Sequence, residues 1–230
     1  RAAKKDFERA ISLGGASVDA SLYLGDAALR DKRWKQALSY YNDAVEIAPE
    51  SAEPYRRRSQ YFSQLKQYDQ ALADYNTLME LQENPGVSDL LQRGQIYESL
   101  EKYNEALIDY NKALRIDPKR GAIHCARGNL YLKIDRPNKA QEEYTKAIKI
   151  NPSSPKPYYL RGVLYLSQEN DDAEKAREAF LQAIALDSTY ADAFNKMGEL
   201  LLKQEVYDEA LQYFRKAVAL DNSHADAYTN

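Results

Sequence analysis

Few residues of this sequence could carry out nucleophilic chemistry, and two of them are adjacent. Cys125 is the single cysteine, and His124 beside it is one of two histidines. A cysteine nucleophile needs a base within hydrogen-bonding reach of its sulfur. On a helix, adjacent residues point toward different faces, so these two side chains would diverge. We therefore expect no Cys–His catalytic pair.

Other catalytic and metal-binding patterns are also missing from the sequence. One cysteine and two histidines provide no group with the spacing of metal ligands. Asp171 and Asp172 have no further ligands near them in the sequence, which favours a solvated turn over a calcium site. No glycine-rich phosphate-binding loop is present. We predict that the chain is not an enzyme and has no catalytic, cofactor-binding or metal-binding residues.

The segments that would position these residues repeat along the chain. The stretch 124–152 can be laid over 90–118, and equivalent residues are then 34 positions apart. The matching pairs include Gly94/Gly128, Tyr97/Tyr131, Ala106/Ala140, Tyr110/Tyr144, Ala113/Ala147 and Pro118/Pro152. A fixed period of this length indicates a repeat architecture in which each unit packs against its neighbours.

This pattern of small residue, aromatic, Ala, aromatic, Ala and Pro resembles the tetratricopeptide repeat (TPR) family. The resemblance implies an all-α fold, a right-handed superhelical solenoid of antiparallel helix pairs. It also implies that the first helix of each pair lines an inner, concave wall along which partners usually lie.

The column positions predict the boundaries of the repeats. An extra residue near 84–86 predicts a turn there, and residues 168–172 lengthen the turn inside repeat five. Because Arg1 falls inside a repeat, we expect a fragment that lacks its true N-terminus. The predicted segments are 1–17 (second helix of a truncated preceding repeat), 18–51, 52–86, 87–120, 121–154, 155–190 (with a two-residue insertion), 191–224, and 225–230 (start of a seventh repeat).

The repeated columns also predict how the helices pack. First helices carry large, small, large residues at i, i+4 and i+7, and second helices carry the complementary small, large, small pattern. Glycine inside a helix costs about 1 kcal/mol relative to alanine. Its presence in five of six repeats therefore indicates close contact with an aromatic ring of the partner helix.

A column of arginines precedes the small residue in repeats two to five. Acidic residues precede the second-helix aromatic in repeats two to four, and we hypothesise arginine–carboxylate pairs between the two helices. Pairing with the acid of the preceding repeat remains open, as does an arginine ladder for anionic ligands. The arginines are Arg58, Arg93, Arg127 and Arg161, and the acids are Asp74, Asp109 and Glu143.

The expected inner wall is unusually apolar in repeats four and five. Its helices are apolar on the packing face as well, so this second stripe is a candidate site for an apolar or helical segment of a partner. Burial of the stripe by neighbouring side chains is the alternative. The predicted partner-binding residues here are Cys125, Asn129, Leu132, Tyr159, Leu160, Val163 and Leu166.

A second candidate surface is basic. Arg56 and Arg57, in the only arginine triplet, are predicted to face the inner wall, where they could bind an acidic peptide. A solvated basic face is the alternative.

Composition limits the remaining function classes. The net charge of −3 and the sequence pI near 5.6 argue against binding to nucleic acid. The sequence contains no run of 18 apolar residues, so we predict no direct membrane insertion. We expect a non-catalytic scaffold or adaptor that binds a protein or peptide. The alternatives are the recognition arm of a larger enzyme or chaperone-linked protein, or an assembly factor that self-associates through exposed terminal helices. The compartment stays open, with a slight preference for the cytoplasm.

Overall fold

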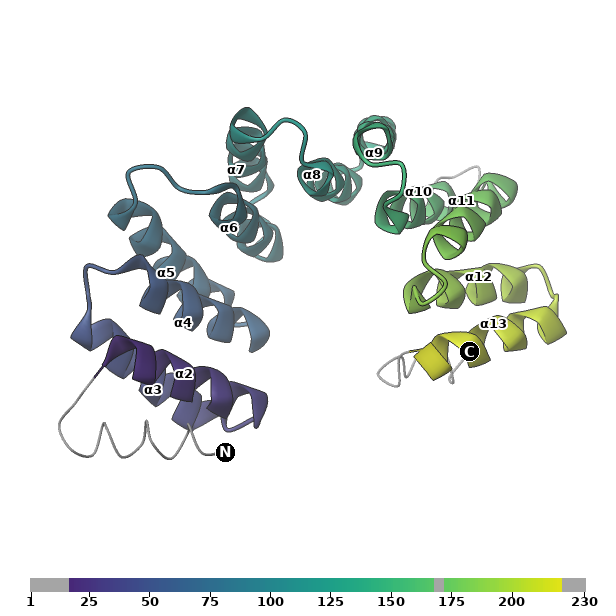
Figure 1. The fold of residues 1–230 in the computed structure, drawn as a ribbon. Coiled ribbons are helices and arrows are strands. Elements are labelled where there is room, and N and C mark those ends of the chain that lie inside the picture. Colours follow the sequence, from purple (N-terminus) through teal and green to yellow (C-terminus); the bar gives the residue numbers. More distant parts are fainter. Residues whose placement is uncertain (1–16, 168–171, 221–230) are drawn as a thin grey trace. The chain divides into compact units, whose positions relative to one another are not determined.

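A computed structural model describes residues 17–167 and 172–220 (Figure 1). These residues form twelve α-helices, and no strand occurs among them. The predicted truncated helix before residue 17, most of the lengthened turn at 168–171 and the start of a seventh repeat lie outside the described residues. The helices are α2 (Val18–Arg30), α3 (Trp34–Ile47), α4 (Ala52–Gln64), α5 (Tyr68–Leu81), α6 (Val87–Ser99), α7 (Tyr103–Ile116), α8 (Gly121–Lys133), α9 (Pro137–Ile150), α10 (Pro155–Ser167), α11 (Ala173–Leu186), α12 (Ala191–Lys203) and α13 (Tyr207–Leu220).

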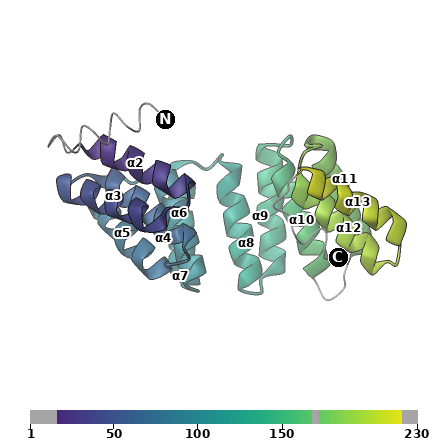
Figure 2. The same cartoon turned by 90° about the horizontal axis from the view of Figure 1, so that it is seen from below.

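The chain divides into two compact units, unit 1 (1–116) with α2 to α7 and unit 2 (117–230) with α8 to α13. In each unit the helices pack as consecutive pairs, and the second helix of one pair contacts the first helix of the next. First helices of neighbouring pairs also touch, as α2 and α4 do in unit 1 and α8 and α10 in unit 2. Figure 2 shows α8, α9 and α10 running side by side. Each unit is therefore a stack of helix hairpins, as predicted.

Outside repeat five, the turn between the two helices of a pair has the same conformation in both units. Lys32 and Glu101 in unit 1 and Asp135 and Glu205 in unit 2 all have φ between 54° and 62°. In the first of these turns, the backbone N–H of Arg33 donates to the carbonyl of Ala28 at 2.8 Å. These are features of a Schellman motif, which ends a helix with one left-handed residue.

Glycine allows the two helices to approach closely in every pair except that of repeat two. A Cβ atom at Gly25 would lie 2.6 Å from the ring of Tyr41, and one at Gly198 would lie 2.7 Å from the ring of Phe214. Both distances are well inside van der Waals contact, so a methyl group would displace the ring. The predicted contact between the glycine column and the second-helix aromatics is confirmed.

Repeat two satisfies the same column with Ser59. Its hydroxyl donates a hydrogen bond of 2.7 Å to the carbonyl of Ala71 on α5, so the buried polar atom is paired. The aromatic rings opposite the small residues form the centre of the core in both units. Those with essentially no exposed surface are Tyr41, Tyr75, Tyr110, Tyr144 and Phe180.

Candidate partner-binding surfaces

In unit 1, the arginine column joins the two helices of a pair. Arg58 donates two hydrogen bonds to Asp74, at 2.8 and 2.7 Å, and Arg93 donates two to Asp109, at 2.7 and 2.8 Å. Such two-pronged pairs are geometrically specific and stronger than neutral hydrogen bonds. Of the two pairings that the sequence left open, the one within a repeat is confirmed here. These guanidinium groups are engaged inside the fold and do not form an open ladder for anions.

The preceding repeat takes part in this network through an asparagine. Arg58 donates to the side-chain oxygen of Asn42 at 2.9 Å, and Arg93 donates to that of Asn76 at 3.3 Å. Each asparagine follows the buried tyrosine of the previous second helix. The arginine therefore links three helices.

In unit 2, Glu143 gathers three partners instead of one. Its carboxylate lies 2.8 Å from Nδ1 of His124, 2.8 Å from Nζ of Lys146 and 3.6 Å from Arg127. Burial raises the pKa of Glu143, but the hydrogen bonds with Lys146 and His124 and the charge of Arg127 outweigh it and leave that pKa below its ordinary value. Arg127 also lies over the ring of Tyr131.

Arg161 has no acid opposite it, because Ala179 occupies that position. The guanidinium carbon lies 5.5 Å from the ring centre of Tyr158, a cation–π contact. Within the described part of the chain, its buried Nε has no hydrogen-bond partner. Arginine–carboxylate pairing is therefore not continued in repeat five, as expected from the alanine at position 179.

The environment of Cys125 gives it no features of a nucleophile. The thiol is buried, and burial raises its pKa to about 11. The neighbouring His124 is hydrogen-bonded to Glu143 rather than to the sulfur. A thiol that stays protonated near neutral pH is a weak nucleophile.

The predicted apolar stripe in unit 2 lies on α8 and α10, two first helices that touch each other. Cys125 is buried, and Asn129 accepts a hydrogen bond of 2.7 Å from the hydroxyl of Tyr144. The other members are partly exposed and keep some surface toward solvent; they are Leu132, Tyr159, Leu160, Val163 and Leu166. We name these five residues the α8–α10 face.

Within the α8–α10 face, the side chain of Tyr159 is held by two aromatic neighbours. Its ring centre lies 5.3 Å from that of Tyr190 in an edge-to-face arrangement and 6.1 Å from that of Phe180. Burial raises its pKa to about 12. Tyr190 precedes α12, and the sequence analysis did not include it. Its position as an aromatic residue just before the first helix of repeat six was the signal that the sequence offered for this contact.

The two candidate arginines of unit 1 already have carboxylate partners. Arg56 donates two hydrogen bonds of 2.9 Å to Asp89 on α6 and a further one to Glu53. Arg57 donates to Glu53 at 2.7 Å and to Asp26 on α2 at 3.0 Å. Together these five hydrogen bonds join three consecutive first helices, α2, α4 and α6.

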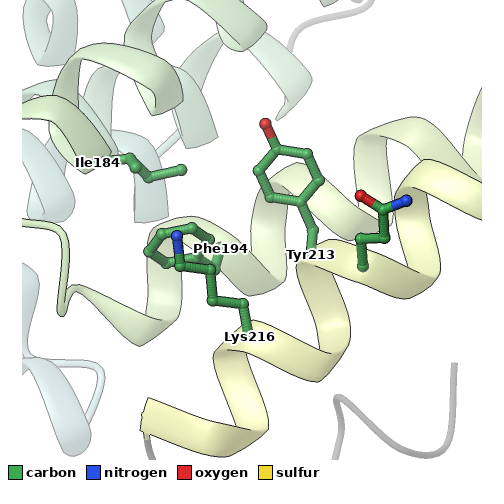
Figure 3. A pocket seen from close by; sticks show the side chains of 5 residues that line it. Ile184, Phe194, Tyr213 and Lys216 are labelled. Carbon is green, nitrogen blue, oxygen red and sulfur yellow. The ribbon is translucent and has the colours of Figure 1, made fainter.

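Each unit also has a pocket that the sequence analysis missed. In unit 2, Ile184 of α11, Phe194 of α12 and Tyr213 and Lys216 of α13 surround a cavity of about 290 Å³ (Figure 3). Lys216 extends over the ring of Phe194, with its ammonium nitrogen 4.6 Å from the ring centre. The pocket of unit 1 lies between α5, α6 and α7 and has a volume of about 540 Å³.

Helix length and side-chain clustering bear on two other classes of site. Among residues 17–167 and 172–220, no helix is long and apolar enough to cross a membrane. The same residues contain no cluster of three or more His, Cys, Asp or Glu side chains that could hold a metal ion.

Solved structures with the same fold cover nearly the whole chain. A tetratricopeptide repeat protein from Parabacteroides merdae aligns with a TM-score of 0.85 at 21% identity, over 99% of this chain and 89% of that one. Yeast Tom70 aligns with a TM-score of 0.74 at 20% identity, over 99% of this chain and 48% of Tom70. The chain therefore spans about half of Tom70. A comparison with curated protein sequences found no match.

A third structure has a described ligand site. YrrB, described as a TPR protein with an unusual peptide-binding site, aligns with a TM-score of 0.50 at 24% identity, over 82% of this chain and 96% of YrrB. At these identities the three structures show a shared fold.

Sequence models of the repeat match most of the chain. Those described as tetratricopeptide repeat match residues 1–52, 52–85, 121–154, 143–178 and 169–225, and one described as TPR repeat matches 94–135. Together with the helix hairpins and the glycine–aromatic contacts, these matches establish that the chain belongs to the tetratricopeptide repeat family.

Proposed function

We propose that this chain is a non-catalytic scaffold that binds a peptide or helix of a partner protein on the α8–α10 face. The proposal rests on one observation: five partly exposed apolar side chains lie on two first helices that contact each other. A partner segment that covered them would remove apolar surface from water. YrrB, which shares the fold, offers a precedent for a peptide-binding site on such a protein.

Tyr159 is the proposed anchor of this interaction. It is held by Tyr190 and Phe180, so little side-chain entropy remains to be lost on binding. An aromatic anchor that is desolvated at the centre of an interface can contribute about 2 kcal/mol. The other two residues of the predicted stripe are held within the fold: Cys125 is buried, and Asn129 accepts a hydrogen bond from Tyr144.

The basic surface at Arg56 and Arg57 is a second proposed contact, for an acidic segment of the same partner. The side chain of Arg57 is 40% exposed, so an incoming carboxylate could replace Asp26 or Glu53 as its partner. Because exposed ion pairs contribute little, such an exchange would alter salt dependence more than affinity.

The test is affinity capture from a cell lysate followed by mass spectrometry. The test variant carries Tyr159→Ala and Val163→Asp, and the matched control carries Leu181→Asp and Ile108→Asp. The control residues are exposed on the second helices α11 and α7. Circular dichroism and thermal unfolding establish that both variants are folded.

We expect the original chain and the control to retain the same specific partner and the test variant to lose it. A partner captured equally by all three proteins would rule out the α8–α10 face as its binding site. A partner lost only from the control would place recognition on the second helices.

Self-association through α13 is a second candidate function. Tyr207 and Leu211 on this helix are 61% and 48% exposed, whereas Leu72, which is equivalent to Leu211, is 8% exposed. A copy of the chain stacked on α13 would cover both side chains. Analytical ultracentrifugation over a range of concentrations tests this directly, because a Leu211→Ser variant would then remain monomeric where the original chain dimerises.

A further inference from the structure

The pocket of unit 1 owes its size to two local features of repeat three. The connection between α5 and α6 holds one residue more than the repeat period requires, and it brings Gly86 to the pocket rim. A Cβ atom built on Gly86 would meet no other atom within 4 Å, so space lies beside it. Leu90 fills the position that tyrosine holds in repeats two and five, and it is smaller. The result is a cavity of about 540 Å³, within the range of ligand-binding pockets.

One part of the pocket lining is formed by large apolar side chains. Met79 comes from α5, Leu90 from α6 and Ile116 from the end of α7. Leu90 is buried and forms part of the floor, whereas Ile116 is 56% exposed. A large apolar side chain placed here would shield Ile116 from water and contact the other two residues.

Two cations form another part of the lining. Lys112 and Arg115 are three residues apart on α7, so they share a face of that helix. In the part of the chain that the structure describes, neither has a carboxylate within ion-pair distance. Arg58 and Arg93 of the same unit are, by contrast, each paired with an aspartate. Lys112 and Arg115 therefore keep their hydrogen-bond donors available.

The equivalent pocket in unit 2 explains why the cation of unit 1 remains available. Ile184, Phe194 and Lys216 occupy the repeat positions of Met79, Leu90 and Lys112. In unit 2 the ammonium group of Lys216 lies over the ring of Phe194 (Figure 3). Leucine offers no such π face, so Lys112 lacks this internal partner.

We propose that the pocket between α5, α6 and α7 is a second recognition site, which binds an acidic segment of a partner protein. A large apolar side chain of that segment enters the pocket, and aspartate or glutamate residues next to it pair with Lys112 and Arg115. Arg115 can accept a carboxylate on two nitrogens at once. This site is separate from the α8–α10 face, and it belongs entirely to unit 1.

The test uses fluorescein-labelled peptides and fluorescence anisotropy with the purified chain. The probe is Asp-Glu-Phe-Asp-Glu with blocked ends. Two control peptides replace its phenylalanine by serine or its four acids by lysine. Lys112→Glu with Arg115→Glu is the test variant, and Lys216→Glu is the matched control in the equivalent pocket.

We expect the phenylalanine probe to bind the original chain and the Lys216→Glu control with similar affinity, and both control peptides to bind more weakly. The test variant should lose about tenfold or more in affinity, and binding should weaken as salt is added. Thermal unfolding of each variant separates this loss from a role of the two cations at the end of α7.

Three results would overturn the proposal. The first is a dissociation constant above about 1 mM for the phenylalanine probe with the original chain. The second is equal binding of the probe to the original chain and to a folded test variant. The third is equal binding of the serine and phenylalanine probes, which would indicate charge attraction without use of the pocket.

Discussion

Repeats two and three of unit 1 and repeat six of unit 2 hold their helix pairs together differently at one equivalent position. In unit 1, Arg58 and Arg93 each form a two-pronged pair with an aspartate on the partner helix. In repeat six of unit 2, Met197 and Tyr213 occupy the same two columns. The same hairpin therefore forms with an ion pair or with apolar contacts. The backbone geometry does not require the charges, which agrees with the modest net stability of buried ion pairs.

We expect the largest effect on stability where one member of an arginine–aspartate pair is removed. Asp109→Ala leaves the guanidinium of Arg93 partly buried without its carboxylate, and we expect a loss of about 3 to 5 kcal/mol in the free energy of unfolding. Replacing both residues with those of repeat six, Arg93→Met with Asp109→Tyr, should cost much less. Urea denaturation of the two variants measures the difference.

The double variant is the control for this prediction. If it lost as much stability as Asp109→Ala, the ion pair itself would be needed for packing. Repeats three and six would then not be interchangeable at this position.

An intermediate effect is expected at Glu143, where unit 2 uses a carboxylate with three partners. Glu143→Gln keeps the shape but removes the charge that His124, Arg127 and Lys146 share, and we expect a loss of about 2 kcal/mol near pH 7. The folded-state pKa of Glu143 lies below its ordinary value, so the unfolded chain binds more protons at that site in mildly acidic solution. Its contribution is therefore complete above about pH 4.5 and is lost as the pH falls through the folded-state pKa.

Stability measured as a function of pH checks this prediction. The difference between the original chain and Glu143→Gln should shrink steadily below about pH 4.5. A difference that is constant from pH 7 to pH 3 would mean that the carboxylate charge does not act through this network.

The regular part of the structure was predictable because it repeats. The contact of Gly25 with Tyr41 and the pair of Arg93 with Asp109 both follow from column positions, since a residue type that recurs at one offset meets the same neighbour each time. The partners of Arg56 were not predictable in this way. Asp89 and Glu53 lie in different columns of neighbouring repeats, so only the three-dimensional stack shows that they reach the same guanidinium.

The candidate sites depend on departures from the repeat, and the sequence located them less well. The stripe on α8 and α10 could be read from the sequence, but the contact of Tyr159 with Tyr190 depends on how α12 begins. The pocket of unit 1 lies beside the connection with one extra residue before α6 and is lined by Leu90, where repeats two and five have tyrosine. A single sequence shows such an insertion, but its effect on the space between helices requires coordinates.

The smallest predicted effect is a gain in stability at the position where unit 2 lacks an acid. Ala179→Asp places a carboxylate at the repeat position of Asp74 and Asp109, opposite Arg161, whose buried Nε lacks a partner among the described residues. We expect a gain of about 1 kcal/mol, because the new hydrogen bonds satisfy a donor whose desolvation already lowers stability. The same substitution combined with Arg161→Leu should instead be destabilising, since it buries an unpaired carboxylate. Urea denaturation distinguishes the two cases, and equal destabilisation in both would mean that the cation–π contact with Tyr158 holds Arg161 too firmly for it to turn toward a carboxylate.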